Sequence, residues 1–173
     1  SSAASDVYKR QDLLDSFKSS LVDRLMSDVP LGIVLSGGLD SSLVAALARD
    51  AAKEAEKPVP ECWTVADSEE NSDWMAAELV AKTFDLNHHQ HILDQKSFEN
   101  DLSKLVWHGE DLDVTVLFFQ PLFNKMSKHV KVGLCGQGAD ELHAGYPRYR
   151  NLKTHSDLII NRLEMIDYRI NKT

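Results

Sequence analysis

The segment Ile33-Val34-Leu35-Ser36-Gly37-Gly38-Leu39-Asp40-Ser41-Ser42 decides the fold of this chain. Its apolar, β-branched start is typical of a buried strand, and a helix-like run at 43–48 follows directly. Between them, the paired glycines predict a tight turn, because glycine adopts backbone angles closed to other residues. The unpaired amide groups at the helix start would point into this turn, together with serine hydroxyl groups. The segment therefore predicts a phosphate-binding turn between a strand and a helix N-terminus.

An acidic residue distinguishes this turn from the common lysine-containing phosphate loop. Asp40 stands in place of the lysine of a Walker A loop, and no Gly-Lys-Ser/Thr follows. A carboxylate would repel phosphate unless a cation lay between them, so the turn predicts Mg²⁺ as well as a phosphate ligand. An ordinary strand–turn–helix connection is the simpler alternative, and a lone Gly-Gly would favour it.

Length and composition fit one α/β domain of ordinary size. The chain has 173 residues, of which 43% are hydrophobic and 27% charged. No apolar run approaches the roughly 20 residues of a membrane span, so we expect no membrane partner. The net charge of −8 disfavours nucleic acid as a partner, which needs a basic surface. Cys62 and Cys135 have no paired spacing and lie in apolar contexts, which predicts buried thiols in a cytoplasmic protein.

Strand-like and helix-like segments alternate along the chain. After the first strand we expect further strands at 61–66, 88–93 and 131–135, and helices at 12–27, 41–53, 71–85, 118–130 and 155–170, with another helix capped by Ser97. This alternation predicts an α/β fold, a parallel sheet with helices on both faces. Ligands of such sheets bind at the carboxyl ends of the strands. The neighbouring histidines at 88, 89 and 91 are expected to be structural, because adjacent strand residues point to opposite faces.

A second glycine-rich turn follows the strand expected at 131–135. It is Gly136-Gln137-Gly138-Ala139-Asp140-Glu141, and the chain continues with Leu142-His143-Ala144-Gly145-Tyr146. Because the carboxyl ends of parallel strands meet at one edge of the sheet, two such turns can face a single ligand.

Both turns resemble motifs of known enzymes. Ser-Gly-Gly-Leu-Asp-Ser-Ser looks like the pyrophosphate loop of the N-type ATP pyrophosphatases. The second turn is similar to the Gly-Glu-Gly-Ser/Ala-Asp-Glu-Leu-Phe-Gly-Gly-Tyr segment of asparagine synthetases. The resemblance covers roughly Asp12 to Tyr149 and implies an adenine nucleotide alpha hydrolase-like (PP-loop) fold. We expect the first part of a synthetase domain at 12–150, a truncated helical continuation at 151–173, and a non-native tail at 1–11, which resembles translated adaptor sequence.

The resemblance implies an AMP-forming ligase. ATP would activate the β-carboxylate of aspartate as an acyl-adenylate, and ammonia would then displace AMP. The implied ATP- and pyrophosphate-binding residues are Val34, Ser36, Gly37, Gly38, Asp40, Ser41, Ser42, Val65, Cys135 and Gly136. Asp40 and Asp140 would ligate Mg²⁺, and Gln137 would occupy a catalytic position.

Departures from the family pattern leave alternatives open. Many members carry glutamate where this chain has Gln137, and glutamine cannot act as a base. The family's glutaminase domain, which supplies ammonia, and a later lysine that contacts ATP are missing from this chain, so we expect an inactive fragment. The alternatives are a ligase for another carboxylate, as in β-lactam synthetases, and a non-catalytic nucleotide-binding domain. The acceptor carboxylate, the nitrogen donor and a homodimeric state also stay open.

Overall fold

The computed structural model describes residues 2–110, 113 and 117–170, and the chain falls into two compact units, Ser1–Gly136 and Gln137–Thr173. The first unit contains, in order, α1 (Ser2–Arg24), β1 (Leu31–Val34), α2 (Leu39–Glu54), β2 (Glu61–Ala66), α3 (Ser72–Thr83), β3 (His88–Ile92), α4 (Gln95–Gly109), α6 (Gln120–Met126) and β4 (Val132–Leu134). The second contains α7 (Ala139–His143), the 3₁₀ turn η1 (Pro147–Arg150) and α8 (Leu152–Ile170). The predicted division at residue 150 stays a prediction.

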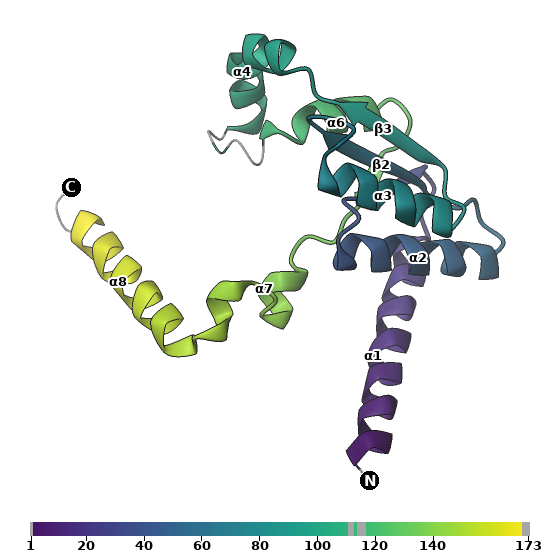
Figure 1. Cartoon of the computed structure of the whole chain (residues 1–173), viewed down its shortest axis with the longest axis horizontal. Coiled ribbons are helices and arrows are strands. Elements are labelled where there is room, and N and C mark those ends of the chain that lie inside the picture. Colours follow the sequence, from purple (N-terminus) through teal and green to yellow (C-terminus); the bar gives the residue numbers. More distant parts are fainter. Residues whose placement is uncertain (1, 111–112, 114–116, 171–173) are drawn as a thin grey trace. The chain divides into compact units, whose positions relative to one another are not determined.

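The described strands form one parallel sheet in the order β3-β2-β1-β4 (Figure 1). In its register Val34 lies opposite Trp63, and Trp63 lies opposite His89. The α/β fold is therefore confirmed. The strand order reverses at β1, because the chain moves outward to β2 and β3 and then returns to place β4 on the other side. The carboxyl ends of β1 and β4 flank this switch point, where open parallel sheets bind ligands.

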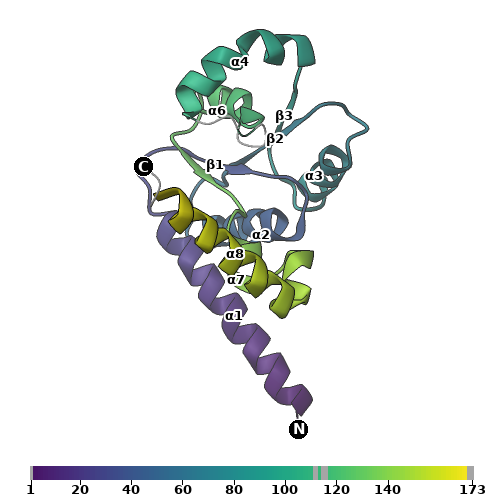
Figure 2. The ribbon, with the colours of Figure 1, turned by 90° about the vertical axis from the view of Figure 1, so that its left-hand side faces the viewer.

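Helices cover both faces of this sheet, as the alternating pattern predicts (Figure 2). One face packs against α1, α2 and α3 through a cluster that includes Leu21, Ile33, Val44 and Ala77. The opposite face packs against α6 through a second cluster, which comprises Trp63, Val65, Leu122, Met126 and Val130. Burial of these apolar surfaces, at about 25 cal/mol per Å², holds the strand ends in fixed positions. No described helix has the length and apolarity needed to cross a bilayer.

Several local predictions need correction. Helix α1 starts at Ser2 rather than residue 12, because Lys9, Arg10 and Gln11 are good helix formers that extend an established helix. Helix α4 is capped by Asp94 and not by Ser97, since the Asp94 carboxylate accepts a hydrogen bond from the Ser97 N–H at 2.8 Å. Cys62 is buried as predicted, whereas Cys135 is exposed, because it follows the edge strand β4.

Candidate nucleotide-binding site

The phosphate-binding turn starts where β1 leaves the sheet at Leu35. The Leu35 N–H donates to the carbonyl oxygen of Trp63 at 2.8 Å, which extends the ladder by one bond beyond the strand. On its other side, the Leu35 carbonyl oxygen accepts from the Thr64 hydroxyl at 2.6 Å. The Leu35 side chain is 1% exposed. The chain therefore enters the turn from an anchored position.

Serine hydroxyl groups hold the turn in shape. Ser41 Oγ accepts from the Ser36 backbone N–H at 3.2 Å and lies 2.9 Å from Ser36 Oγ. Ser41 Oγ also donates to the Gly38 carbonyl at 3.3 Å, and Ser36 Oγ accepts from the Gly38 N–H at 3.3 Å. A hydroxyl group has one proton, so Ser36 must donate to Ser41 in this network. The turn is thus closed by its own side chains, with Ser41 buried beneath it.

Both glycines of the motif lie where the geometry requires them. Gly37 has φ of 77°, in the left-handed region, and a side chain there would collide with the backbone of Ala76 and Ala77 in α3. Gly38 is the N-cap of α2 and carries no side-chain cap. The first backbone N–H groups of α2 have no carbonyl partners inside the helix, and they open toward the turn. This arrangement gives a partial positive charge with room for an anion.

Gly136, the last residue of the first unit, lies against the start of α2. A β-carbon on Gly136 would stand 2.7 Å from the Ser41 backbone nitrogen and 2.9 Å from Asp40 Cβ. Contacts this close exclude every side chain, so the chain after β4 passes directly over the first turn of α2. The predicted meeting of the two complete turns over one ligand stays a prediction.

Three of the apolar or thiol residues expected to bind ATP, Val34, Val65 and Cys135, separate into two groups. Val34 and Cys135 line an apolar cavity of about 280 Å³ beside β4, which Phe123 and Met126 also border. Val65 does not line this cavity and packs in the cluster beneath α6, where it is 8% exposed.

Ser42, at the end of the first motif, has an enclosed side chain. Its Oγ is buried and has no hydrogen-bond partner among the described residues, while its N–H continues the α2 hydrogen bonds to Gly38 at 3.0 Å. A buried hydroxyl without a partner costs about 1–3 kcal/mol, which is unusual outside a functional region.

Gln137 and Asp140 belong to the second compact unit. Gly138, with φ of 92°, caps α7, and Asp140 lies in the first turn of this helix. A β-carbon on Gly145 would collide with the Asp140 carboxylate, and the Gly145 N–H donates to the Asp140 carbonyl at 3.0 Å. Glycine at 145 therefore leaves room for the Asp140 carboxylate. Sharing of one cation by Asp40 and Asp140 stays a prediction, as does the role of Gln137.

The histidines of β3 have separate partners. His88 Nε2 lies 2.8 Å from the Thr64 hydroxyl, and burial lowers the pKa of His88. His89 bonds Glu61 at 2.9 Å and stacks on Trp63 at 4.1 Å between ring centroids. Among the described residues, no group of three His, Cys, Asp or Glu side chains could hold a metal ion.

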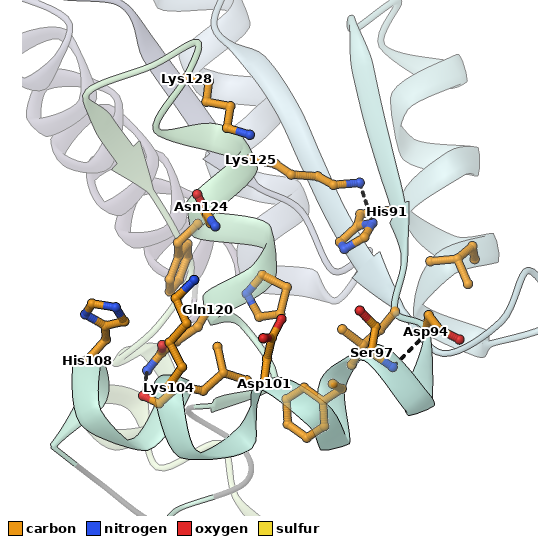
Figure 3. Close-up of a pocket in the computed structure, with 16 residues that line it drawn as sticks. His91, Asp94, Ser97, Asp101, Lys104, His108, Gln120, Asn124, Lys125 and Lys128 are labelled. Atoms are coloured by element: carbon orange, nitrogen blue, oxygen red, sulfur yellow. Dashed lines mark hydrogen bonds between the residues drawn. The ribbon is translucent and has the colours of Figure 1, made fainter.

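A cavity larger than the one beside β4 lies elsewhere in the first unit (Figure 3). It measures about 700 Å³ between α4, α6 and the end of β3. Lys104, Lys125 and Lys128 border it, and Lys125 Nζ lies 2.7 Å from His91 Nδ1. Sequence reasoning missed this cavity because its lining residues form no motif. None of the predicted nucleotide-site residues lines it.

Comparison with known proteins connects these features to one family. The family model described as asparagine synthase matches residues 12–169. The chain is 34% identical over 154 residues to asparagine synthetase [glutamine-hydrolyzing] 1 of Arabidopsis thaliana, which covers 84% of this chain and 26% of that protein. It is 30% identical over 143 residues to asparagine synthetase [glutamine-hydrolyzing] 1 of Bacillus subtilis, covering 81% and 22%.

A solved structure supports the fold independently. The NH3-dependent NAD synthetase of Campylobacter jejuni superposes with a TM-score of 0.56 at 18% identity, covering 79% of this chain and 60% of that chain. The chain spans about a quarter of the length of the curated relatives named above. With the family model matching most of its residues, the chain belongs to the asparagine synthase family.

Proposed function

We propose that this chain is the ATP-binding part of an AMP-forming ligase that converts a carboxylate, aspartate in the leading case, into its amide. One observation carries the proposal, the close approach of Gly136 to Ser41 and Asp40. This contact brings Gly136, which opens the second glycine turn, onto the N-terminus of α2. A site of this kind can bind a phosphate chain through one turn while the other supplies groups for the reacting end.

The first turn is suited to hold a leaving pyrophosphate. The network around Ser41 fixes the turn, so the free N–H groups at the start of α2 need no rearrangement to meet phosphate oxygens. Donors fixed in advance stabilise developing negative charge more than donors that must reorganise. A single such donor is typically worth about 3–4 kcal/mol in a transition state.

The carboxylates fit a hard cation. Asp40 lies in the first turn of α2 and is partly exposed, and Gly145 leaves space beside the Asp140 carboxylate. Carboxylate oxygens are preferred ligands of Mg²⁺, which commonly bridges protein and substrate phosphates. We propose that Asp40 and Asp140 hold Mg²⁺. When bound, the cation neutralises the charge of the pyrophosphate.

The apolar cavity that includes Val34 and Cys135 is the proposed adenosine site. It lies along β4, whose neighbour β1 leads into the first turn. The α-phosphate of a nucleotide placed there would be attacked by the substrate carboxylate to give an acyl-adenylate, which ammonia would convert to the amide. Both relatives are named as glutamine-hydrolyzing enzymes, so we propose that ammonia comes from a glutaminase domain of the whole protein. Cytoplasmic location and a homodimer stay predictions.

Gln137 favours a second candidate function, that of a nucleotide-binding domain. Glutamine keeps a hydrogen-bond acceptor but cannot accept a proton as a base, so a nucleotide-binding domain without chemistry is the main competitor. A ligase for another carboxylate is the third candidate.

Aspartate-dependent exchange of labelled pyrophosphate into ATP by the full-length protein separates these functions. The ligase predicts exchange that requires both aspartate and Mg²⁺. Exchange with a different carboxylate alone would move the assignment to a related ligase. Binding of ATP without pyrophosphate exchange for any carboxylate would contradict the ligase proposal and favour a non-catalytic nucleotide-binding domain.

A further inference from the structure

Thr64 makes a contact that the family motifs do not explain. It lies in the middle of β2, is 2% exposed, and directs its hydroxyl away from its own strand toward β1. The hydroxyl donates to the Leu35 carbonyl oxygen at 2.6 Å. A hydroxyl that donates to one partner can only accept from another, so His88 Nε2 must be the donor in their 2.8 Å contact.

The burial of His88 fits this hydrogen-bond direction. Burial lowers the pKa of His88, which favours the neutral ring, and the neutral ring that donates from Nε2 is a single defined tautomer. Nearby Glu78 acts in the opposite direction and His89 in the same direction. The two hydrogen bonds therefore run in one direction: His88 donates to Thr64, and Thr64 donates to the Leu35 carbonyl oxygen.

The Leu35 carbonyl and the Ser36 N–H belong to the same planar peptide unit. In a trans peptide these two groups point in opposite directions, and rotation of the plane moves both together. Thr64 holds the carbonyl end, and Ser41 Oγ holds the N–H end at 3.2 Å. The peptide that opens the phosphate turn is thus clamped from both sides, one side in the sheet and the other in α2.

We infer that Thr64 and His88 are positioning residues for the phosphate turn, which act through the Leu35–Ser36 peptide and keep the turn in its anion-binding shape before nucleotide arrives. This inference rests on the proposed function, because it assigns the clamp to binding of Mg²⁺-ATP. Neither side chain needs to touch the nucleotide.

Substitutions at Thr64 test the clamp directly in the full-length protein. Thr64→Val keeps the side-chain shape and removes the hydroxyl, and Thr64→Ser restores it. We expect Thr64→Val to weaken Mg²⁺-ATP binding about tenfold in calorimetry, and Thr64→Ser to stay within about threefold of the parent, since an unpaired buried carbonyl lets the peptide rotate.

Thr83→Val is the matched control. The Thr83 hydroxyl also donates to a backbone carbonyl, that of Leu79 at 2.7 Å, but it lies at the end of α3 on the surface. We expect its ATP affinity to equal that of the parent. Equal losses in Thr83→Val and Thr64→Val, or no loss in a folded Thr64→Val protein, would overturn the inference.

Hydrogen exchange of the Ser36 amide separates this inference from the proposed function. Without nucleotide, we expect the Ser36 amide to exchange at least tenfold faster in Thr64→Val than in the parent, and unchanged exchange would overturn the clamp. If the parent binds no Mg²⁺-ATP, the proposed function fails. Faster Ser36 exchange in Thr64→Val would still show that the clamp holds the peptide, although no nucleotide binds. His88→Leu, in the edge strand, provides the same readout with a smaller expected effect should Thr64→Val not fold.

Discussion

Gly136 and Ser41 approach so closely that the α-carbon of the first has no room for a side chain. A β-carbon at 136 would stand 2.7 Å from the Ser41 backbone nitrogen, although the two residues are far apart in sequence. The contact joins the end of β4 to the start of α2 at the switch point of the sheet. It fixes the position of Gly136, which opens the second glycine turn, against the first turn.

Replacement of Gly136 by alanine should therefore disrupt both stability and nucleotide binding. The new methyl group forces the chain away from α2, and overpacking of this kind costs about 1–3 kcal/mol. Gly133→Ala is the control, because a β-carbon there meets only Met126 Cε at 3.6 Å, an ordinary contact. Chemical denaturation measures both variants. Equal stability of the two would show that the contact is easily relieved.

Loss of the Ser41 hydroxyl should loosen the first turn. Ser41→Ala leaves the Ser36 N–H without its partner in a buried setting, and we expect the free energy of unfolding to fall by about 1–3 kcal/mol. Ser103→Ala, on the exposed surface of α4, should change it by less than about 0.5 kcal/mol. A Ser41→Ala protein as stable as Ser103→Ala would remove Ser41 from its central place in the network.

The effect of Asp40 on ATP binding should depend on Mg²⁺. Asp40→Asn removes a cation ligand, so it should weaken binding when Mg²⁺ is present, yet leave or improve binding in EDTA because repulsion of phosphate is relieved. Asp73→Asn is the matched control for Asp40→Asn, since Asp73 lies in the first turn of the neighbouring helix α3. Calorimetry with and without Mg²⁺ measures the effect, and the same loss in both conditions would contradict a metal role.

The two thiols should differ sharply in reactivity. Burial raises the pKa of the Cys62 thiol from 9.0 to about 12, whereas Cys135 is exposed. A thiol reagent at pH 8 should label Cys135 in the native protein and Cys62 only after unfolding. Because the folded state keeps the Cys62 proton while the unfolded state loses it, the contribution of Cys62 to stability should fall as pH rises from about 9 toward 12. Rapid native labelling of a Cys135→Ala protein would contradict this.

The sequence predicted the elements that local pattern determines. The strand at 61–66 and the start of α3 near residue 71 were recoverable because alternation, apolar runs and capping residues act over a few positions. The first turn was recoverable because its glycines and serines serve a backbone conformation within the same segment. The approach of Gly136 to the start of α2 followed from the parallel topology and not from either motif alone.

Other features depend on tertiary contacts that no local pattern contains. The Thr64 hydroxyl bonds the carbonyl of a residue on another strand, so a buried threonine in an apolar strand gave no signal of a role. Cys135 sits in an apolar context but follows an edge strand, and edge position depends on the whole sheet. The cavity between α4 and α6 arises from packing of helices that lie apart in sequence.

The central claim is that one Mg²⁺-ATP binds where the two glycine turns meet. A structure of the protein with Mg²⁺ and a non-hydrolysable ATP analogue tests it most directly. We predict phosphate oxygens against the free backbone N–H groups of residues 39–41 at the start of α2, and a single cation bound by both Asp40 and Asp140. Nucleotide bound in the lysine-lined cavity between α4 and α6, or a cation that touches neither carboxylate, would contradict the account.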